Sequence, residues 1–429
     1  MKLCIVAYKF GTEQEIGEHL GTYHYFIEKM RKLVRLGHEV TVVAPYIGFF
    51  KKGSNNVDGI KIFRYWPPMM ASIWAWPVNR IIRAVYIKKT QKQVLRAVKG
   101  GCEAVYVWQA RETGYAVAKI RDKLGVPFIF RQITAWHWHF QRTAQEIFGG
   151  KVWYKMLRKI GLGKIADMKL EFLLGRKIQK KYAKIIYEKA DKIIFLSNAA
   201  IKEGKELGLN EAKAQALGVA IEEDIFKPMD SRSALREKFG LEDDKVILFI
   251  GRINFEEKGI GYLIEAMPEI LSKISNAKLV VVGGGGESER MKALIKKLGM
   301  EKYVQVFGKK PFSELPRIIN SSDVFAVPSV WMEAFGQVTI IAMSCGIPVV
   351  TSDAGASPEI NIHGETGLVV PARDSEALAG AIVNILSDNV LRKKMGEAAR
   401  QRVLENYTYD AITKRCLEII QGVLHSYHL

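Results

Sequence analysis

Cysteine is scarce in this chain. Its 429 residues contain four, Cys4, Cys102, Cys345 and Cys416, which are scattered and form no C-x-x-C pair. Small secreted scaffolds and zinc ribbons need clustered cysteines, so this spacing excludes a disulfide framework and a structural zinc site. We expect four reduced thiols in a cytoplasmic protein.

Long apolar runs are also missing. The stretch Ala334–Ser352 has no charge, but it contains polar residues, a glycine and a proline that suit a loop, a helix and a strand of a globular fold. Tyr65–Asn79 is uncharged too, but its three prolines exclude a continuous helix. At the start of the chain, Lys9 ends a short apolar run, which excludes a signal peptide. We therefore predict a cytoplasmic location, with room for a peripheral position on the inner face of the membrane.

Positive charge is abundant and unevenly placed. The formal net charge is +19, yet residues 1–200 carry 36 basic against 14 acidic residues, and residues 201–429 carry 28 against 31. Two segments of the first half, Lys51–Lys99 and Lys151–Lys192, hold most of the excess, interleaved with aromatic residues. Solvated helix faces explain such a pattern, and so does a surface for anionic lipid, with lysines near the headgroups and tryptophans at the interface. Nucleic acid is the weaker interpretation, because no nucleic-acid module is visible, and we predict no nucleic-acid partner.

The hydrophobic pattern predicts an α/β fold of two doubly wound, Rossmann-like domains. Short apolar runs that suit buried parallel strands alternate with amphipathic stretches of ten or more residues. Expected strands are Lys2–Ala7, Glu39–Ala44, Lys245–Ile250, Lys278–Val282, Val324–Pro328, Pro348–Ser352 and Gly367–Val370. Expected helices are one with an apolar face from Tyr23 to Val34, then Gly259–Ile274, Glu287–Leu298 and Tyr409–Leu424.

This pattern sets the predicted domain limits. Residues 1–217 form the basic first domain and residues 218–408 the second, and the two face each other across a cleft. Residues 409–429 form a helix that packs back toward the first domain.

Three loops of the second half carry candidate chemistry. Gly251–Gly259 follows a strand and contains Arg252 and Lys258, two cations suited to a diphosphate. The same residues are equally compatible with a surface turn that carries two cations and binds no ligand. The loop that begins with Gly283 and Gly284 allows close backbone approach, without the spacing of a Walker loop. Glu333–Gln337 opens a helix, whose free N–H groups bind phosphate, and Glu333 beside them suits sugar hydroxyls.

Several of these runs resemble the family 4 (group 1) retaining glycosyltransferases of GT-B fold. In the second half the resemblance rests on Gly251-Arg252, Lys258-Gly259, Val281-Val282-Gly283, Ser322–Phe325, Pro328-Ser329, Glu333–Gly336, Ala342–Val350 and Gly364–Pro371. In the first half it rests on Gly21, Leu36–Val40, Ala190–Lys192, Leu217–Val219 and Phe226–Pro228.

The resemblance implies transfer of a hexose from a UDP- or GDP-linked sugar to a cell-envelope glycolipid or polysaccharide. It implies that Arg252 and Lys258 neutralise the departing diphosphate and that Glu333 holds sugar hydroxyls. The amides of Phe335, Gly336 and Gln337 would hold phosphate, and Gly283 and Gly284 would also bind the donor. Gly21 would lie in a loop that closes over donor and acceptor. No metal or other cofactor is implied, and the absence of Asp-x-Asp agrees with this.

Two positions depart from the family pattern. Ile341 stands where the family has a second glutamate, which binds the ribose of the nucleotide. Ile133 stands where the family commonly has a histidine, although His137 and His139 follow closely. The departures define the alternative hypothesis, a non-catalytic binding or partner subunit of the same fold that has lost full donor binding.

Overall fold

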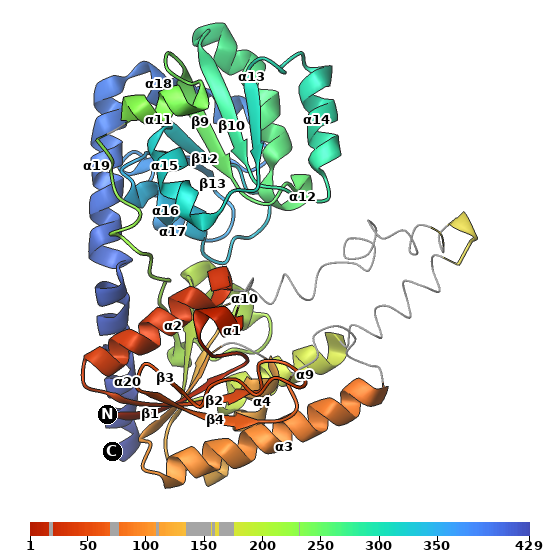
Figure 1. The fold of residues 1–429 in the computed structure, drawn as a ribbon, viewed down its shortest axis with the longest axis vertical. Coiled ribbons are helices and arrows are strands. Elements are labelled where there is room, and N and C mark those ends of the chain that lie inside the picture. Colours follow the sequence, from red (N-terminus) through yellow and green to blue (C-terminus); the bar gives the residue numbers. More distant parts are fainter. Residues whose placement is uncertain are drawn as a thin grey trace. The chain divides into compact units, whose positions relative to one another are not determined.

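The computed structural model describes residues 1–16, 20–68, 77–108, 111–133, 156, 159–162, 176–230 and 232–429. The chain divides into two compact units (Figure 1). The first contains Met1–Leu217 and Thr413–Leu429, and the second contains Gly218–Ile412.

A parallel sheet forms the centre of the first unit. Within the described residues it has eight strands in the order β3-β4-β2-β1-β5-β6-β7-β8, and only the β3–β4 pair is antiparallel. The strands are β1 (Lys2–Ala7), β2 (Glu39–Pro45), β3 (Asn56–Val57), β4 (Ile60–Tyr65), β5 (Ala104–Trp108), β6 (Phe128–Arg131), β7 (Lys192–Phe195) and β8 (Ala214–Ala216). The central strands are apolar and buried, as strands covered on both faces must be.

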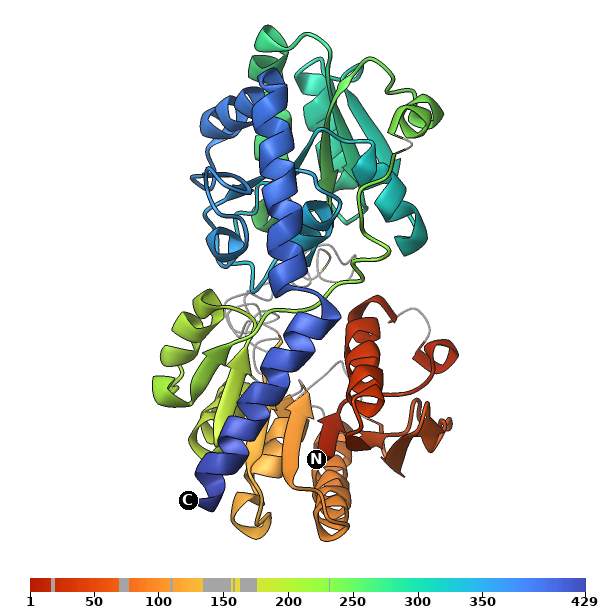
Figure 2. The same cartoon turned by 90° about the vertical axis from the view of Figure 1, so that its left-hand side faces the viewer.

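Helices cover both faces of this sheet. They are α1 (Glu13–Ile16), α2 (Leu20–Arg35), α3 (Pro77–Lys99), α4 (Arg111–Ala118), α9 (Arg176–Lys189), α10 (Asn198–Lys205) and α20 (Tyr409–His428). Helices α3, α4 and α9 pack side by side on one face. On the other face, Phe26 of α2 stacks on Trp108 of β5 at 4.4 Å, and α20 lies over β5, β7 and β8 (Figure 2).

The second unit contains a fully parallel six-stranded sheet in the order β11-β10-β9-β12-β13-β14. Its strands are β9 (Lys245–Ile250), β10 (Ala277–Val282), β11 (Val304–Gly308), β12 (Val324–Val327), β13 (Val349–Ser352) and β14 (Gly367–Val370). In chain order this is 3-2-1-4-5-6, the order of a dinucleotide-binding Rossmann sheet. The direction of winding therefore reverses between β9 and β12.

The helices of the second unit also form two layers. They are α11 (Arg232–Phe239), α12 (Phe255–Lys258), α13 (Ile260–Lys273), α14 (Ser288–Lys297), α15 (Leu315–Asn320), α16 (Gln337–Ser344), α17 (Ser357–Ile360), α18 (Ser375–Ser387) and α19 (Asn389–Asn406). Apolar faces of α13, α14 and α18 bury the core on one side of the sheet. On the other side α16 packs against α19.

The predicted α/β fold with two parallel-sheet domains is confirmed. Strands β1, β9 and β14 have the predicted limits, and helices α13 and α14 differ from theirs by one residue at each end. One placement is wrong, because Gly21 lies in the first turn of α2 and not in a loop. The apolar spacing marks only where the helix meets the core, and a helix can begin earlier than that.

Along the described residues, no helix combines the length and the apolarity that crossing a bilayer requires.

Candidate active site

The predicted site residues of the second unit gather where its winding reverses. In open α/β sheets, ligands bind beyond the carboxyl ends of the strands at this point. Arg252 follows β9 by two residues, and Glu333 follows β12 by six. Each loop then opens a helix, α12 after β9 and α16 after β12.

The loop after β9 is shaped by helix α12 and its two ends. The Asn254 side chain caps α12 by accepting a hydrogen bond from the Glu257 N–H at 2.7 Å. Gly259 ends it in the left-handed region, with φ of +64°. A Cβ atom at Gly259 would lie 1.8 Å from the carbonyl oxygen of Pro328. The β9 and β12 loops therefore touch through their backbones, and only glycine permits this contact.

This contact brings Lys258 and Glu333 together. The Lys258 ammonium forms an ion pair with Glu333 Oε1, and the Ser329 hydroxyl donates to the same oxygen at 2.9 Å. From the described residues, Oε2 of Glu333 accepts no hydrogen bond, so it can receive a hydroxyl from a ligand. The Lys258 side chain is 26% exposed and that of Glu333 17%, so both can be reached from solvent.

Arg252 rests on a buried carboxylate. Its Nη2 donates to Glu257 Oε2 at 2.7 Å, and the two side chains are 48% and 8% exposed. The carbonyl of Glu257 accepts bonds from the N–H groups of Val330 and Trp331, at 3.0 and 3.2 Å. Glu257 thus orients the guanidinium and fastens the β12 loop, while much of Arg252 faces solvent.

The glycine loop after β10 packs against the β9 loop. Gly251 donates to the carbonyl of Val282 at 3.0 Å, and Ile253 donates to that of Gly284 at 3.2 Å. Gly283 has φ of +145°, and a Cβ atom there would lie 1.8 Å from the carbonyl oxygen of Gly251. Two of the predicted donor-binding glycines, Gly283 and Gly284, therefore support the backbone that carries Arg252.

The predicted phosphate-binding segment Phe335–Gln337 lies at the start of α16. Gly336 immediately precedes this helix, and Gln337 is its exposed first residue. The Phe335 ring is 6% exposed and packs edge-on against Tyr407, with 5.5 Å between ring centroids. The Phe335 side chain is therefore part of the hydrophobic core, and only the backbone N–H of Phe335 remains a candidate for binding phosphate.

The positions that depart from the family pattern fall in different units. Ile341 lies on α16 and is buried, 7% exposed. Ile133 follows β6 in the first unit and is half-buried, and its neighbour Gln132 accepts a bond from the Tyr187 hydroxyl at 2.7 Å. His137 and His139 lie outside the described residues.

Sequence reasoning missed the residues that hold the predicted ones in place. Asn254, Glu257 and Ser329 act through contacts between loops. Lys309, after β11, lies along Gly284, with its Cγ 3.2 Å from where a Cβ atom would be. The role of Asn254 could have been predicted, because asparagine before a helix is a common cap. The contacts of Glu333 with Ser329 and Lys258 could not, because Lys258 lies in a different segment of the chain.

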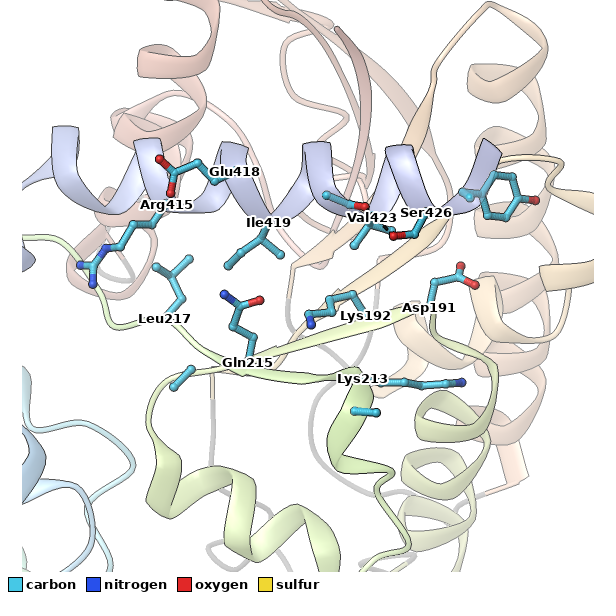
Figure 3. A pocket seen from close by; sticks show the side chains of 14 residues that line it. Asp191, Lys192, Lys213, Gln215, Leu217, Arg415, Glu418, Ile419, Val423 and Ser426 are labelled. Atoms are coloured by element: carbon cyan, nitrogen blue, oxygen red, sulfur yellow. Dashed lines mark hydrogen bonds between the residues drawn. The ribbon is translucent and has the colours of Figure 1, made fainter. Parts of the chain in front are cut away.

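Elsewhere the described residues offer further hollows but no metal centre. They contain no group of three or more His, Cys, Asp or Glu side chains that could hold an ion. A cavity of about 740 Å³ opens in the first unit between α20 and the strands β7 and β8 (Figure 3). Lys192, Gln215, Arg415 and Glu418 contribute to its walls, and none of the predicted site residues does.

The strand order and the loops at the winding reversal define a Rossmann-like α/β domain with a candidate ligand site, and comparison with known proteins narrows this class. Residues 231–402 match the family model described as "Glycosyl transferases group 1". This segment contains Arg252, Lys258, Glu333 and all six strands of the second sheet. The match lies within the second unit, so this unit resembles the group 1 glycosyltransferases.

Curated relatives match over part of the chain. A GDP-mannose-dependent alpha-(1-6)-phosphatidylinositol monomannoside mannosyltransferase of Mycolicibacterium smegmatis is 31% identical over 54% of this chain. An uncharacterized glycosyltransferase, MJ1607 of Methanocaldococcus jannaschii, is 36% identical over 46% of it. The matching stretches span 63% and 50% of the two relatives' own lengths.

Solved structures match over the whole chain. Anabaena Alr3699/HepE, in complex with UDP, has a TM-score of 0.69 at 17% identity and covers 98% of this chain and 100% of its own. Sucrose-phosphate synthase from Thermosynechococcus elongatus has a TM-score of 0.69 at 20% identity and covers 99% of both chains. These likenesses show the fold, which is the GT-B fold of two parallel-sheet domains.

Proposed function

We propose that this protein is a family 4 retaining glycosyltransferase that moves a hexose from a UDP- or GDP-linked sugar to a cell-envelope glycolipid or polysaccharide. One observation carries the proposal. Arg252, Lys258 and Glu333 gather at the winding reversal of a group 1 glycosyltransferase domain, on loops that touch through Gly259.

The arrangement suits the departure of a nucleoside diphosphate. Negative charge grows on the diphosphate as the bond to the sugar breaks, and cations already in place stabilise that charge. The guanidinium N–H groups of Arg252 that do not bond to Glu257 can donate hydrogen bonds to the diphosphate, and Lys258 provides a point charge. With two cations to do this work, we propose that no metal is needed.

Glu333 suits the sugar that is transferred. Its Oε1 accepts from Lys258 and Ser329, which leaves Oε2 for a hydroxyl of the hexose. A charge-assisted hydrogen bond of this kind contributes about 1.5–3 kcal/mol. The similarity to a GDP-mannose-dependent enzyme and to a protein solved with UDP supports a nucleotide sugar as the donor.

The first unit suits an acceptor at an anionic membrane surface. Helix α3 has seven basic residues and no acidic one among its 23 positions. A groove of about 470 Å³ lies between α3, α4 and α9, and none of its ten lining residues is acidic. Arg80, Lys88 and Lys119 line it, and Ile81, which follows Arg80 in the chain, is 67% exposed. Cations next to an exposed apolar side chain are typical of surfaces that bind anionic lipid.

The alternative, a non-catalytic subunit of the same fold, is favoured by the departures from the family pattern, and above all by Ile341. A buried isoleucine cannot replace the carboxylate that binds ribose in the family. This hypothesis predicts no thermal stabilisation by UDP or GDP, and no change in nucleotide affinity when Ile341 is replaced by glutamate.

Incubating the purified protein with a panel of UDP- and GDP-sugars and cell-envelope membranes tests the proposal. We expect release of the nucleoside diphosphate with one donor and a labelled product in the lipid or polysaccharide fraction. No release with any donor, while a known transferase works in parallel, would overturn the proposal in favour of the non-catalytic subunit.

A further inference from the structure

A lysine and a cysteine meet in the interior of the first unit. Lys29 of α2 is 1% exposed, and its Nζ donates to Sγ of Cys416 on α20 at 3.0 Å. Cys416 is likewise 1% exposed. The two residues are 387 positions apart in the chain, and neither takes part in the site described above.

Aromatic groups surround this pair. The Lys29 nitrogen lies 5.3 Å from the ring centre of Tyr106 and 5.5 Å from that of Trp108, and Cys416 Sγ lies 3.9 Å from the Tyr106 hydroxyl. No carboxylate among the described residues pairs with Lys29. A buried ammonium without an anion is costly, and ring faces compensate only in part. The sulfur of Cys416 is thus the polar atom that the Lys29 nitrogen contacts.

The electrostatics of the pair agree with its geometry. Burial by itself would lower the pKa of Lys29, but Cys416 and Tyr106 outweigh burial and raise it. A thiolate next to an ammonium is the form of cysteine that reacts with oxidants.

We infer that Lys29 and Cys416 form an oxidative modification site, at which a peroxide joins the two side chains through a sulfur–nitrogen bond. The thiolate first attacks one oxygen of hydrogen peroxide, so that an S–O bond forms, the O–O bond breaks and sulfur is oxidised to the sulfenic acid. The hydroxide that leaves takes one proton from the Lys29 ammonium and becomes water. The freed amine then attacks sulfur, the S–O bond breaks, and a second water departs with the remaining proton. Thiolate, ammonium and one peroxide thus give a sulfenamide and two waters.

The setting favours this product over the usual ones. A sulfenic acid is normally trapped by a second thiol, but all four cysteines are free and buried, and Cys416 is sealed from bulky thiols of the solvent. The nitrogen of Lys29 is already in contact with the sulfur. The bond would fasten the C-terminal helix α20 to α2 within the first unit.

Mass spectrometry of the full chain after treatment with hydrogen peroxide tests the inference. We expect a loss of about two mass units, for the two hydrogens removed. The original mass should return when dithiothreitol is added to the unfolded chain, because the folded chain shields Cys416 from thiols. Trypsin cuts after Arg415, so the linked product is the C-terminal peptide 416–429 attached to a peptide that contains an uncut Lys29.

Matched variants make the test specific. Lys29→Met fills the same volume without an amine and should give no link, and Cys416→Ala should give none either. Cys345→Ala should keep the link, because burial raises the pKa of the Cys345 thiol to about 12 and leaves it unreactive. Recovery of Cys416 from the wild type as an unchanged thiol, or with added oxygen and no linked peptide, would overturn the inference, and this readout does not depend on how the variants fold.

Discussion

Gly259 is the residue on which the geometry of the candidate site most directly depends. A Cβ atom there meets the carbonyl of Pro328 at 1.8 Å, at a φ of +64°. Gly259→Ala must therefore separate the β9 and β12 loops, and we expect it to lower the free energy of unfolding of the second unit by more than about 3 kcal/mol. Urea denaturation followed by tryptophan fluorescence measures this loss.

Gly240 provides the matched control for that variant. It has the same φ of +64°, but nothing lies within 4 Å of its missing Cβ atom. Gly240→Ala should therefore cost only the left-handed conformation, about 1–2 kcal/mol. Equal losses in the two variants would show that the backbone contact with Pro328 does not matter.

Arg252 is expected to matter for turnover and not for folding. Its side chain is 48% exposed, so loss of the ion pair with Glu257 should cost at most about 1 kcal/mol of stability. Loss of a cation from the departing diphosphate should lower kcat by about 100-fold or more. Arg290→Ala is the control, because Arg290 is similarly exposed and pairs with Glu287. Stability and kcat that fall in proportion in Arg252→Ala would mean that the arginine is structural.

Substitution of Ile341 can show whether the donor site is weakened or lost. If nucleotide binds beside α16, Ile341→Glu restores a carboxylate for the ribose and should tighten UDP or GDP binding by about tenfold or more. Ile341→Gln introduces a side chain of the same shape as glutamate but without its charge, so its gain in nucleotide affinity should be smaller. Isothermal titration with both nucleotides measures the change. An unaltered affinity in Ile341→Glu would favour the non-catalytic subunit.

At the scale of elements, the sequence predicts the strands and helices from their repeating apolar pattern. It does not predict contacts between loops that lie far apart in the chain. Continuous apolar runs such as Lys245–Ile250 can only be buried strands of a covered sheet, so their limits follow from composition. The same pattern places Arg252 and Glu333 at strand ends. It cannot show that Gly259 touches Pro328, or that Ser329 donates to Glu333, because these contacts depend on how neighbouring loops fold. Gly21 was misplaced because its loop position was taken from the family resemblance, whereas in this chain α2 already begins at Leu20.

Helices α3 and α9 are the elements expected to hold the protein on membranes. Lys88 and Lys92 of α3 and Lys181 and Lys184 of α9 are exposed. Replacing all four with glutamine should reduce binding to vesicles of anionic phospholipid by at least tenfold at physiological salt, because each cation near such a surface contributes about 1 kcal/mol. Vesicle sedimentation measures this, and nucleotide affinity should stay the same.

The control for this surface lies in the second unit. Lys292, Lys296 and Lys297 of α14, with Lys394 of α19, are equally exposed, so replacing them removes the same charge from the nearly neutral half of the chain. This variant should bind vesicles like the wild type. An equal loss in both variants would mean that total charge, and not the face formed by α3 and α9, attracts the membrane. Binding of duplex or single-stranded nucleic acid with steep salt dependence would contradict a lipid surface.

At the scale of the whole molecule, the two halves of the chain divide the proposed work. The positive charge that dominates the composition lies in the first 200 residues. The segment that matches the group 1 glycosyltransferase model, residues 231–402, lies in the half that is close to neutral. In the proposed function, the excess positive charge belongs to the acceptor side, and the donor chemistry is assigned to Arg252, Lys258 and Glu333. The base, the sugar and the linkage depend on pocket shape, which composition and periodicity do not encode.

Nucleoside diphosphate release by the wild type and by Arg252→Ala, with the same UDP- and GDP-sugars and the same acceptor membranes, tests the central claim most directly. We expect release by the wild type with one of these donors, and a rate at least about 100-fold lower in Arg252→Ala while its folding is preserved. Release at equal rates by the two proteins, or none by the wild type beside a working transferase, would contradict it.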